Sequence, residues 1–288
     1  MEVVRLIIQL GVVSFLPLMM LALGLSLDYR EIWRCMRHPV IWRGLLVGAI
    51  AVPLLAIVVV ALLPLRPMAS GIILLMAFAP GCPIIVVRVR RQKGNTAAAL
   101  ALTLVLTAAA IVMLPLALVL LRAFFPFEFH TSALGVLGKV APSLLIPLAL
   151  GLGARSRAPK LAAKLASVVV WAFKAVFAVL VVTILVIGIP HLARLTVWAV
   201  LAMLLVTTGA AVIGEVAGGK RAEDRALLAT AAIYGNPAIA LYVAQTSYPA
   251  LEIAPLIALY VLLRLVAQIP FKQWQRWHVR PPLSAAPR

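Results

Sequence analysis

Long apolar runs alternate with short polar segments along the whole chain. A helix needs about 20 apolar residues to span the hydrocarbon core of a bilayer. Nine runs come close to this length or exceed it, and each predicts one transmembrane helix. They cover residues 4–27, 40–63, 69–90, 96–122, 132–154, 162–187, 194–215, 224–246 and 251–271. The pattern therefore predicts an all-α polytopic membrane protein with about nine transmembrane helices.

Two of these runs contain residues that cannot continue a helix. Pro80, Gly81 and Pro83 interrupt the third run, and Gly235 and Pro237 interrupt the eighth. Proline removes a backbone donor and glycine frees the backbone dihedrals, so backbone groups are left unpaired at bilayer depth. Isolated kinks are common in membrane helices, and they are tolerated where protein or a water-filled cavity surrounds them. Paired breaks in corresponding halves of a chain indicate the binding site of a transporter.

Basic residues fall in every second connection between the apolar runs. One side carries nineteen Lys or Arg: Arg30, Arg34, Arg37, Arg43, Arg88, Arg90, Arg91, Lys93, Arg155, Arg157, Lys160, Lys164, Lys220, Arg221, Arg225, Lys272, Arg276, Arg280 and Arg288. The other side carries Arg5, Arg66, Arg122 and Arg194. Because basic loops stay in the cytoplasm, we expect an inner-membrane protein with its amino terminus outside and its carboxyl terminus in the cytoplasm. The broken runs then cross in opposite directions, which predicts an inverted repeat with two broken, crossing helices.

Composition agrees with a membrane protein and excludes several other classes. The chain is 65% hydrophobic and 12% charged, with a mean hydropathy of +1.13. Its formal charge of +18 is spread between the spans, so it indicates membrane orientation and not nucleic-acid binding. The chain has no Gly-rich loop ending in Lys-Ser/Thr, and its two cysteines and four histidines are too scattered for a metal or catalytic site. We therefore expect neither an enzyme nor a cofactor, and a gradient as the energy source for any transport.

Residues at and near the breaks are candidates for binding an anionic substrate. The positive ends of half-helices attract anions. The expected substrate-binding residues are Pro80, Gly81, Cys82, Pro83, Arg88, Thr103, Tyr234, Gly235, Asn236 and Pro237. Arg88 lies roughly 7.5 Å beyond Pro83 along a helix. It could face the cavity, or it could extend to the lipid headgroups together with Arg90 and Arg91.

Three other charged residues lie within or beside the apolar runs. Lys174 lies roughly 12 Å into the sixth run, where it could bind substrate or reach the interface with its aliphatic stem. Arg264 lies nearer a membrane end and is expected to extend to the interface. Glu215 closes the seventh run, where it could pair with Lys220 or Arg225 or relay a proton.

Short motifs lie along most of the chain. They are residues 23–27 before a basic loop, residues 79–83, Gly94-Asn95 twelve residues after Cys82, Thr103, Thr107, and the break at residues 235–237. Together they resemble the bile acid:sodium symporter family. The resemblance implies a nine-helix member with a panel domain of about 4–27 and 132–187 and a core domain of about 40–122 and 194–271. Substrate would bind between the domains, and residues 272–288 would form a basic cytoplasmic tail.

The chain departs from the family pattern where the resemblance implies sodium ligands. Ile85 and Val86 replace a Ser-Asn pair, Ala99 replaces a serine, and Ala231 replaces a glutamate. Thr103 and Asn236 remain as candidate ligands. Aliphatic side chains supply no oxygen to a cation, so we expect transport without the two-sodium coupling that the family implies.

The sequence thus predicts a secondary transporter of a small organic anion, a carboxylate or sulfonate, working by alternating access in either direction. Cys82 leaves open a metalloid exporter, because arsenite exporters of a related superfamily use a cysteine in a similar broken segment and a soft thiolate suits a metalloid. A channel, or a membrane sensor or partner protein without transport activity, would share the same apolar spans. The expected partners are the substrate and the lipid bilayer, with the oligomeric state left open.

Overall fold

Helices are the regular secondary structure in the part of the chain that the structure describes. The computed structural model describes residues 2–26, 29–92, 94–124, 133–192, 196–244 and 250–278. Within these ranges it contains helices and no strand, which confirms the all-α prediction. Residues 279–288 of the expected cytoplasmic tail lie outside the described residues.

The helices follow the order of the apolar runs. The first half contains α1 (Glu2–Ser26), α2 (Tyr29–Met36), α3 (Pro39–Leu46), the π-helical turn η1 (Val47–Ala51), α4 (Val52–Leu62), α5 (Pro67–Ala77), α6 (Ile84–Arg91) and α7 (Thr96–Phe124). The second half contains α8 (Ala133–Arg157), α9 (Pro159–Leu192), α10 (Val197–Ala217), α11 (Ala222–Ile233), α12 (Pro237–Ala244) and α13 (Ala250–His278).

Two of these helices differ from the sequence expectation. Helix α13 continues to His278, beyond the predicted end of the ninth run at residue 271. Helix α2 lies in a segment that the charge pattern assigned to a basic loop. It combines an exposed Trp33 with an exposed Arg34, a composition that suits a helix lying along a membrane surface.

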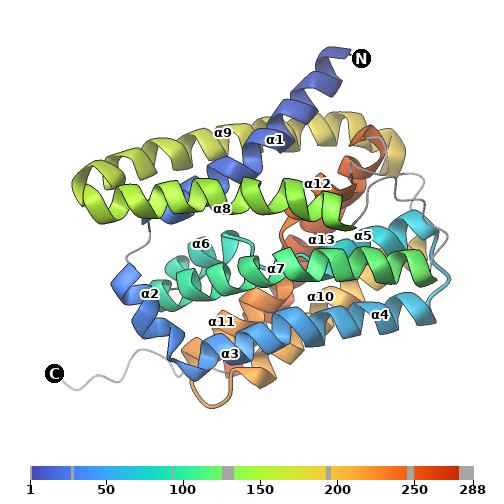
Figure 1. Cartoon of the computed structure of the whole chain (residues 1–288). Helices are drawn as coiled ribbons and strands as arrows, with labels where there is room; N and C mark the ends of the chain where they lie inside the picture. The colour runs from blue at the N-terminus through green and yellow to red at the C-terminus, as the bar shows by residue number, and fades with distance from the viewer. Residues whose placement is uncertain are drawn as a thin grey trace.

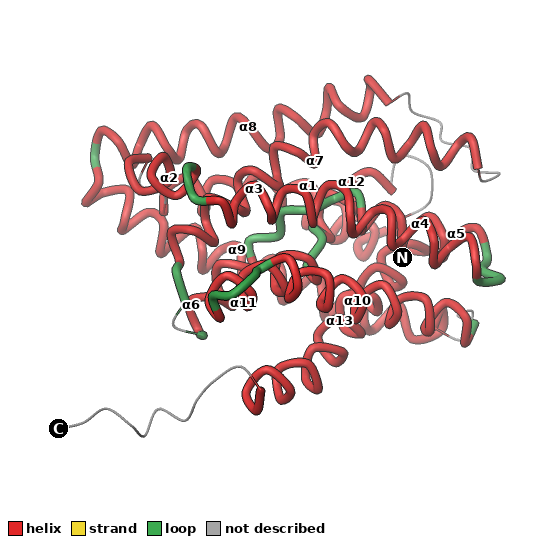
Figure 2. The backbone as a smooth tube through the Cα atoms, turned by 90° about the horizontal axis from the view of Figure 1, so that it is seen from below, coloured by secondary structure: helices red, strands yellow, loops and turns green. Residues whose placement is uncertain are grey.

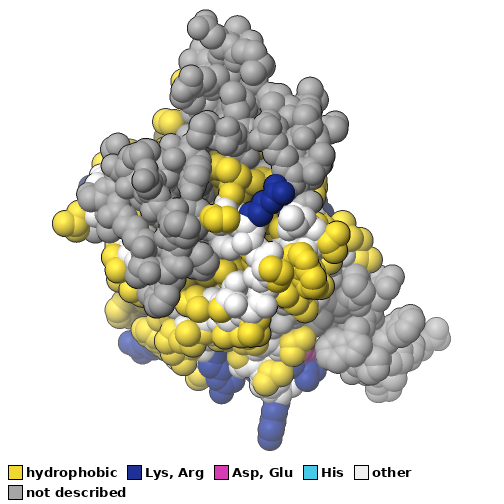
Figure 3. Space-filling view, turned by 90° about the vertical axis from the view of Figure 1, so that its right-hand side faces the viewer, with side chains coloured by type: hydrophobic (Ala, Val, Ile, Leu, Met, Phe, Trp, Pro, Cys, Tyr) yellow, Lys and Arg dark blue, Asp and Glu magenta, His cyan; other side chains and the backbone are white. Residues whose placement is uncertain are grey.

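Several helices are long and apolar enough to span a bilayer. Within the described residues, four meet the length of a spanning helix: Pro39–Leu62, Thr96–Val119, Val197–Ala217 and Ala222–Val243. Shorter apolar helices cover Val13–Ser26, Pro67–Ala77 and Pro255–Ile269. Hydrophobic side chains also make up much of the described surface in Figure 3. The chain is an integral, multi-pass membrane protein, and nine crossings stay a prediction.

Helices α1, α8 and α9 pack against one another and form one layer, at the top of Figure 1. Glycines bring α1 and α8 together. A Cβ atom on Gly24 would lie 2.5 Å from the carbonyl oxygen of Leu148, and one on Gly151 would lie 2.8 Å from that of Leu21. Small residues allow such close approach between membrane helices. Helices α3 to α7, α10 and α11 lie below this layer in Figure 1.

Both predicted helix breaks are present. Residues 78–83 separate α5 from α6, and residues 234–236 separate α11 from α12. Loop segments accordingly pass through the middle of the helical bundle, away from its ends, in Figure 2. Helix α5 packs against α12, and α6 packs against α11. The two broken helices therefore meet at their breaks.

The breaks lie where two buried apolar clusters meet. The larger cluster includes Ala79 and Ala238, and the smaller one includes Cys82 and Tyr234. Each break thus contributes residues to both clusters. The polar backbone that the breaks expose is surrounded by protein, which is the condition for tolerating it at bilayer depth.

Candidate functional site

Asn236 joins the two breaks. Its side chain is fully buried, and its Nδ2 donates a hydrogen bond to the carbonyl oxygen of Gly81 over 3.4 Å. Its Oδ1 accepts from the backbone N–H of Ala238 over 3.1 Å, which caps the first turn of α12. Its own backbone N–H donates to the carbonyl oxygen of Ala79. A single residue therefore ties the second break to the first and starts the half-helix that follows.

Gly81 is held in place by α7. It has φ +91°, a left-handed conformation that glycine adopts without strain. The Thr107 hydroxyl oxygen lies 3.2 Å from the Gly81 carbonyl oxygen. A Cβ atom on Gly81 would lie 2.6 Å from the Thr107 backbone nitrogen. Both the conformation and the close contact with α7 therefore require glycine here.

Thr103 and Thr107 have different roles in this geometry. The Thr103 hydroxyl is buried and donates to the carbonyl oxygen of Ala99 within its own helix, over 2.7 Å. Thr107 lies one turn further on and reaches the break. Thr103 is one of the site residues that the sequence predicts, whereas Thr107 belongs only to the motifs that resemble the family. Both lie on the same side of α7, but the spacing alone did not tell which one contacts Gly81.

Gly235 brings the second break against two other elements. A Cβ atom on Gly235 would overlap the carbonyl oxygen of Met76 in α5. It would also lie 3.1 Å from Nη1 of Arg264 in α13. The absence of a side chain thus allows α5, α13 and the break to meet at one point.

Arg264 corrects the sequence expectation. The sequence predicts that its side chain extends to the membrane interface. In the structure the residue is buried, with only 3% of its surface exposed. Because α13 continues to His278, Arg264 lies about 20 Å from the end of its helix. Its guanidinium carbon lies 4.1 Å from the ring centroid of Tyr260, one turn earlier on the same face. The charge therefore points into the protein.

A polar face of α13 surrounds this arginine. Tyr260, Arg264 and Gln268 follow at intervals of four residues, which puts them on one side of the helix. All three are buried. The interval was the signal in the sequence that could have identified Arg264 as an interior residue. Gln268 links the face to the second break, because its Oε1 accepts a hydrogen bond from the Tyr234 hydroxyl over 2.7 Å.

Arg88 lies on the other side of Tyr234. It is half-buried, and its guanidinium carbon lies 5.7 Å from the Tyr234 ring centroid, within the range of a cation–π contact. Arg90 and Arg91, by contrast, are exposed. The structure thus separates Arg88 from its basic neighbours and brings it to the second break.

The positions expected for sodium ligands come together in an apolar environment. Ile85, Ala99 and Ala231 belong to one buried cluster together with Cys82, and Val86 packs against it. None of these side chains has an oxygen atom. The departures from the family pattern therefore belong to a single apolar cluster in the structure.

The remaining candidate residues differ in their burial. Pro80 and Cys82 are buried, and Pro83 and Pro237 are half-buried. Lys174 is exposed on α9. Glu215 pairs with Arg225, one of the two partners expected for it, with 3.3 Å between Oε1 and Nε.

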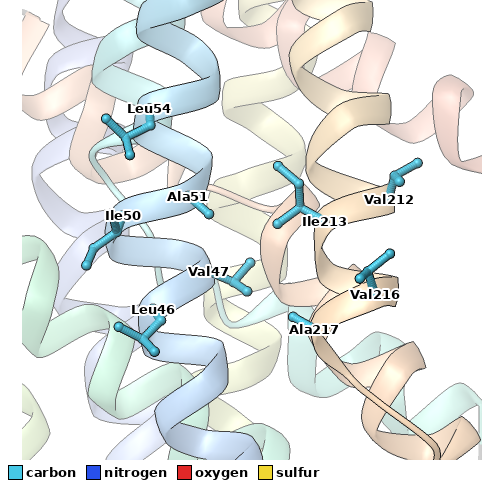
Figure 4. A pocket seen from close by; sticks show the side chains of 9 residues that line it. All are labelled: Leu46, Val47, Ile50, Ala51, Leu54, Val212, Ile213, Val216 and Ala217. Carbon is cyan, nitrogen blue, oxygen red and sulfur yellow. The ribbon is translucent and has the colours of Figure 1, made fainter.

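A groove of about 550 Å³ lies away from the breaks, between α10 and the α3–η1–α4 segment (Figure 4). Its lining is apolar: Leu46, Val47, Ile50, Ala51, Leu54, Val212, Ile213, Val216 and Ala217. The groove lies beside the π-helical turn that precedes Pro53, which has no N–H to donate to the preceding turn. It offers no group that recognises an anion, so the crossing of the breaks remains the candidate site.

Comparison with known proteins gives a family assignment. No curated protein matches the chain. Residues 13–193, more than half of the chain, match the sequence model of the Sodium Bile acid symporter family, a family of transporters. This range includes the first broken helix and Thr107, and it ends before the second broken helix and Arg264. The chain belongs to the sodium bile acid symporter family.

Proposed function

We propose that the protein is a secondary carrier that moves a small organic anion across the inner membrane by alternating access. The observation that carries this proposal is the contact between the two breaks, in which Asn236 donates to Gly81 and its N–H to Ala79. In transporters with paired broken helices, the half-helix ends at such a crossing hold the substrate. Family membership supports transport in general.

An inverted repeat would relate the two halves of the core. The segment α3–α4, the broken helix α5–α6 and the helix α7 form one unit in chain order. The helix α10, the broken helix α11–α12 and the helix α13 repeat the order. The charge pattern makes the two units cross in opposite directions, with the amino terminus outside and the carboxyl terminus in the cytoplasm.

Helices α1, α8 and α9 would then form the panel domain against which this core moves. Their mutual packing in one layer supports that division. Substrate bound at the crossing would be exposed to one side of the membrane and then to the other as the two domains rock. The direction of net transport depends on the gradients of the substrate and of any coupled ion.

Counterflow in proteoliposomes tests the carrier. Vesicles loaded with unlabelled pyruvate, glycerate or mandelate should transiently accumulate the labelled anion from outside, and the rate should saturate with concentration. A channel would equilibrate the label without accumulation. A sensor or partner protein would show no protein-dependent flux of any of the three anions, and either result would contradict the proposal.

A further inference from the structure

The polar face of α13 contains buried donors that lack acceptors. Among the described residues, Nε and Nη1 of Arg264, the hydroxyl of Tyr260 and Nε2 of Gln268 have no hydrogen-bond partner. All four atoms carry hydrogen and can donate. Buried donors around a positive charge bind most strongly to an acceptor that carries a negative charge.

Among the described residues, no carboxylate pairs with the buried Arg264. Arginine remains protonated in proteins, so its charge is buried together with its side chain. A buried charge without a counter-ion destabilises a fold strongly, and ionisable groups inside a membrane protein mark sites of function. The ring of Tyr260 lies against the guanidinium but supplies no negative charge. The ion pair found elsewhere in the described chain, Glu215–Arg225, does not include this residue.

The charge lies at the crossing of the two breaks. Nη1 of Arg264 lies close to Gly235, the residue before Asn236. The positions that would hold sodium are filled by aliphatic side chains, in the buried cluster that also includes Cys82 and Tyr234 of the two breaks. The described chain thus has a fixed positive charge beside the second break, and aliphatic side chains at the expected sodium positions.

We propose that Arg264 binds the carboxylate of the transported anion, with donors from Tyr260 and Gln268, and that this fixed charge takes the electrostatic role of a bound sodium ion. The inference rests on the proposed transport function, and it adds a residue and a substrate class to it. A carboxylate presents two oxygens, each able to accept more than one hydrogen bond, which matches a set of several donors.

Thermal unfolding of the purified full-length protein in sodium-free choline buffer tests the binding step. The probes are pyruvate, glycerate and mandelate, each compared with its neutral amide. At least one carboxylate should raise the Tm of the wild type, and the amides should not. Arg264→Gln should weaken the apparent affinity by about tenfold or more, the scale of a hydrogen bond between charged groups.

Two controls separate binding from folding. Arg90→Gln changes an exposed arginine on α6 and should leave the carboxylate shift intact. Arg264→Lys keeps the positive charge on a shorter side chain and should retain part of the increase in Tm that the carboxylate causes. Ligand-free Arg264→Gln should unfold at the same or a higher temperature than the wild type, because the unpaired buried charge is gone.

Each other result contradicts the inference. A wild-type shift retained in Arg264→Gln shows that the anion binds elsewhere, and no shift with any carboxylate shows that none binds. A large fall in the ligand-free Tm, or failure of Arg264→Gln to fold, shows that Arg264 serves the fold. Counterflow separates the two proposals: Arg264-dependent binding without flux contradicts the carrier alone, whereas flux at wild-type rate in Arg264→Gln contradicts only the role of Arg264.

Discussion

Asn236 connects the first break to α12, because its polar atoms bond to both. The amide nitrogen reaches the first break, the carbonyl oxygen caps α12, and the backbone N–H bonds to Ala79. A side chain of this size with both a donor and an acceptor is needed to do this. We therefore expect Asn236 to contribute both to stability and to the proposed transport.

Asn236→Ala should lower both the stability of the protein and its transport rate. Loss of a helix cap and of a buried hydrogen bond should decrease the free energy of unfolding by about 1–3 kcal/mol. Counterflow should fall much more than in Arg90→Ala, which removes an exposed side chain of α6. Thermal unfolding and counterflow on both variants provide the measurement. Equal loss of transport in the two variants would show that the crossing is not the site.

Cys82 distinguishes an anion carrier from a metalloid exporter. The thiol is buried in an apolar cluster, and no group of three His, Cys, Asp or Glu among the described residues could hold a metal ion with it. We expect Cys82→Ala to retain carboxylate counterflow at close to the wild-type rate, because a small apolar residue fits the same space. Cells expressing the wild type and the variant should tolerate arsenite equally. Tolerance that depends on Cys82 would favour the metalloid exporter.

At the scale of the element, the broken helices depend on backbone geometry more than on side chains. The first break needs the left-handed conformation of Gly81 and its contact with Thr107 in α7. The second needs Gly235 to pass the end of α5. Because these are contacts of backbone atoms, even a methyl group is too large at either glycine.

Gly81→Ala should therefore destabilise the protein by about 2 kcal/mol or more, from a strained dihedral and an overpacked contact. Gly138→Ala is the matched control, since Gly138 lies within α8 and a Cβ atom there meets nothing within 4 Å. That substitution should be neutral or slightly stabilising. The measurement is the Tm of each variant compared with that of the wild type. A Gly81→Ala protein as stable as the Gly138→Ala protein would contradict the assignment of the break.

At the scale of the whole molecule, the proposed role of Arg264 predicts that a charge of the protein replaces the sodium coupling that the family name describes. An anion that crosses a low-dielectric interior needs a positive partner during the crossing. The aliphatic cluster around Ala99 and Ala231 supplies no ligand for a mobile cation, whereas Arg264 supplies a charge that stays with the protein. In the proposed cycle the anion crosses without a co-transported cation, so net transport moves negative charge across the membrane.

Replacement of sodium by choline should thus leave counterflow unchanged. The measurement is the initial rate of labelled pyruvate, glycerate or mandelate exchange in matched sodium and choline buffers. A membrane potential imposed with potassium and valinomycin should change net uptake, because the anion moves without a compensating ion. Loss of flux in choline buffer would show that transport is coupled to sodium, and it would contradict the proposal that Arg264 takes the role of the ion.

The features that the sequence determined by itself are those with local causes. Apolar length predicts helices, and Pro80, Pro83 and Pro237 end them, because a missing N–H and a rigid ring act on the nearest turn whatever surrounds it. The family resemblance and the loss of oxygen atoms at the sodium positions were likewise visible residue by residue. These predictions required no knowledge of which helices touch.

The features that only the tertiary structure decided depend on the rotation of each helix about its axis. A helix that is apolar all round gives no periodic signal for its buried face. The choice of Thr107 over Thr103 at Gly81, and the contact of Arg264 with Gly235, therefore followed from the packing of α7 and α13 against the breaks. Residues more than 150 positions apart meet there, as in the contact of Gly81 with Asn236. Such contacts are set by how all the helices pack together, and no local pattern contains them.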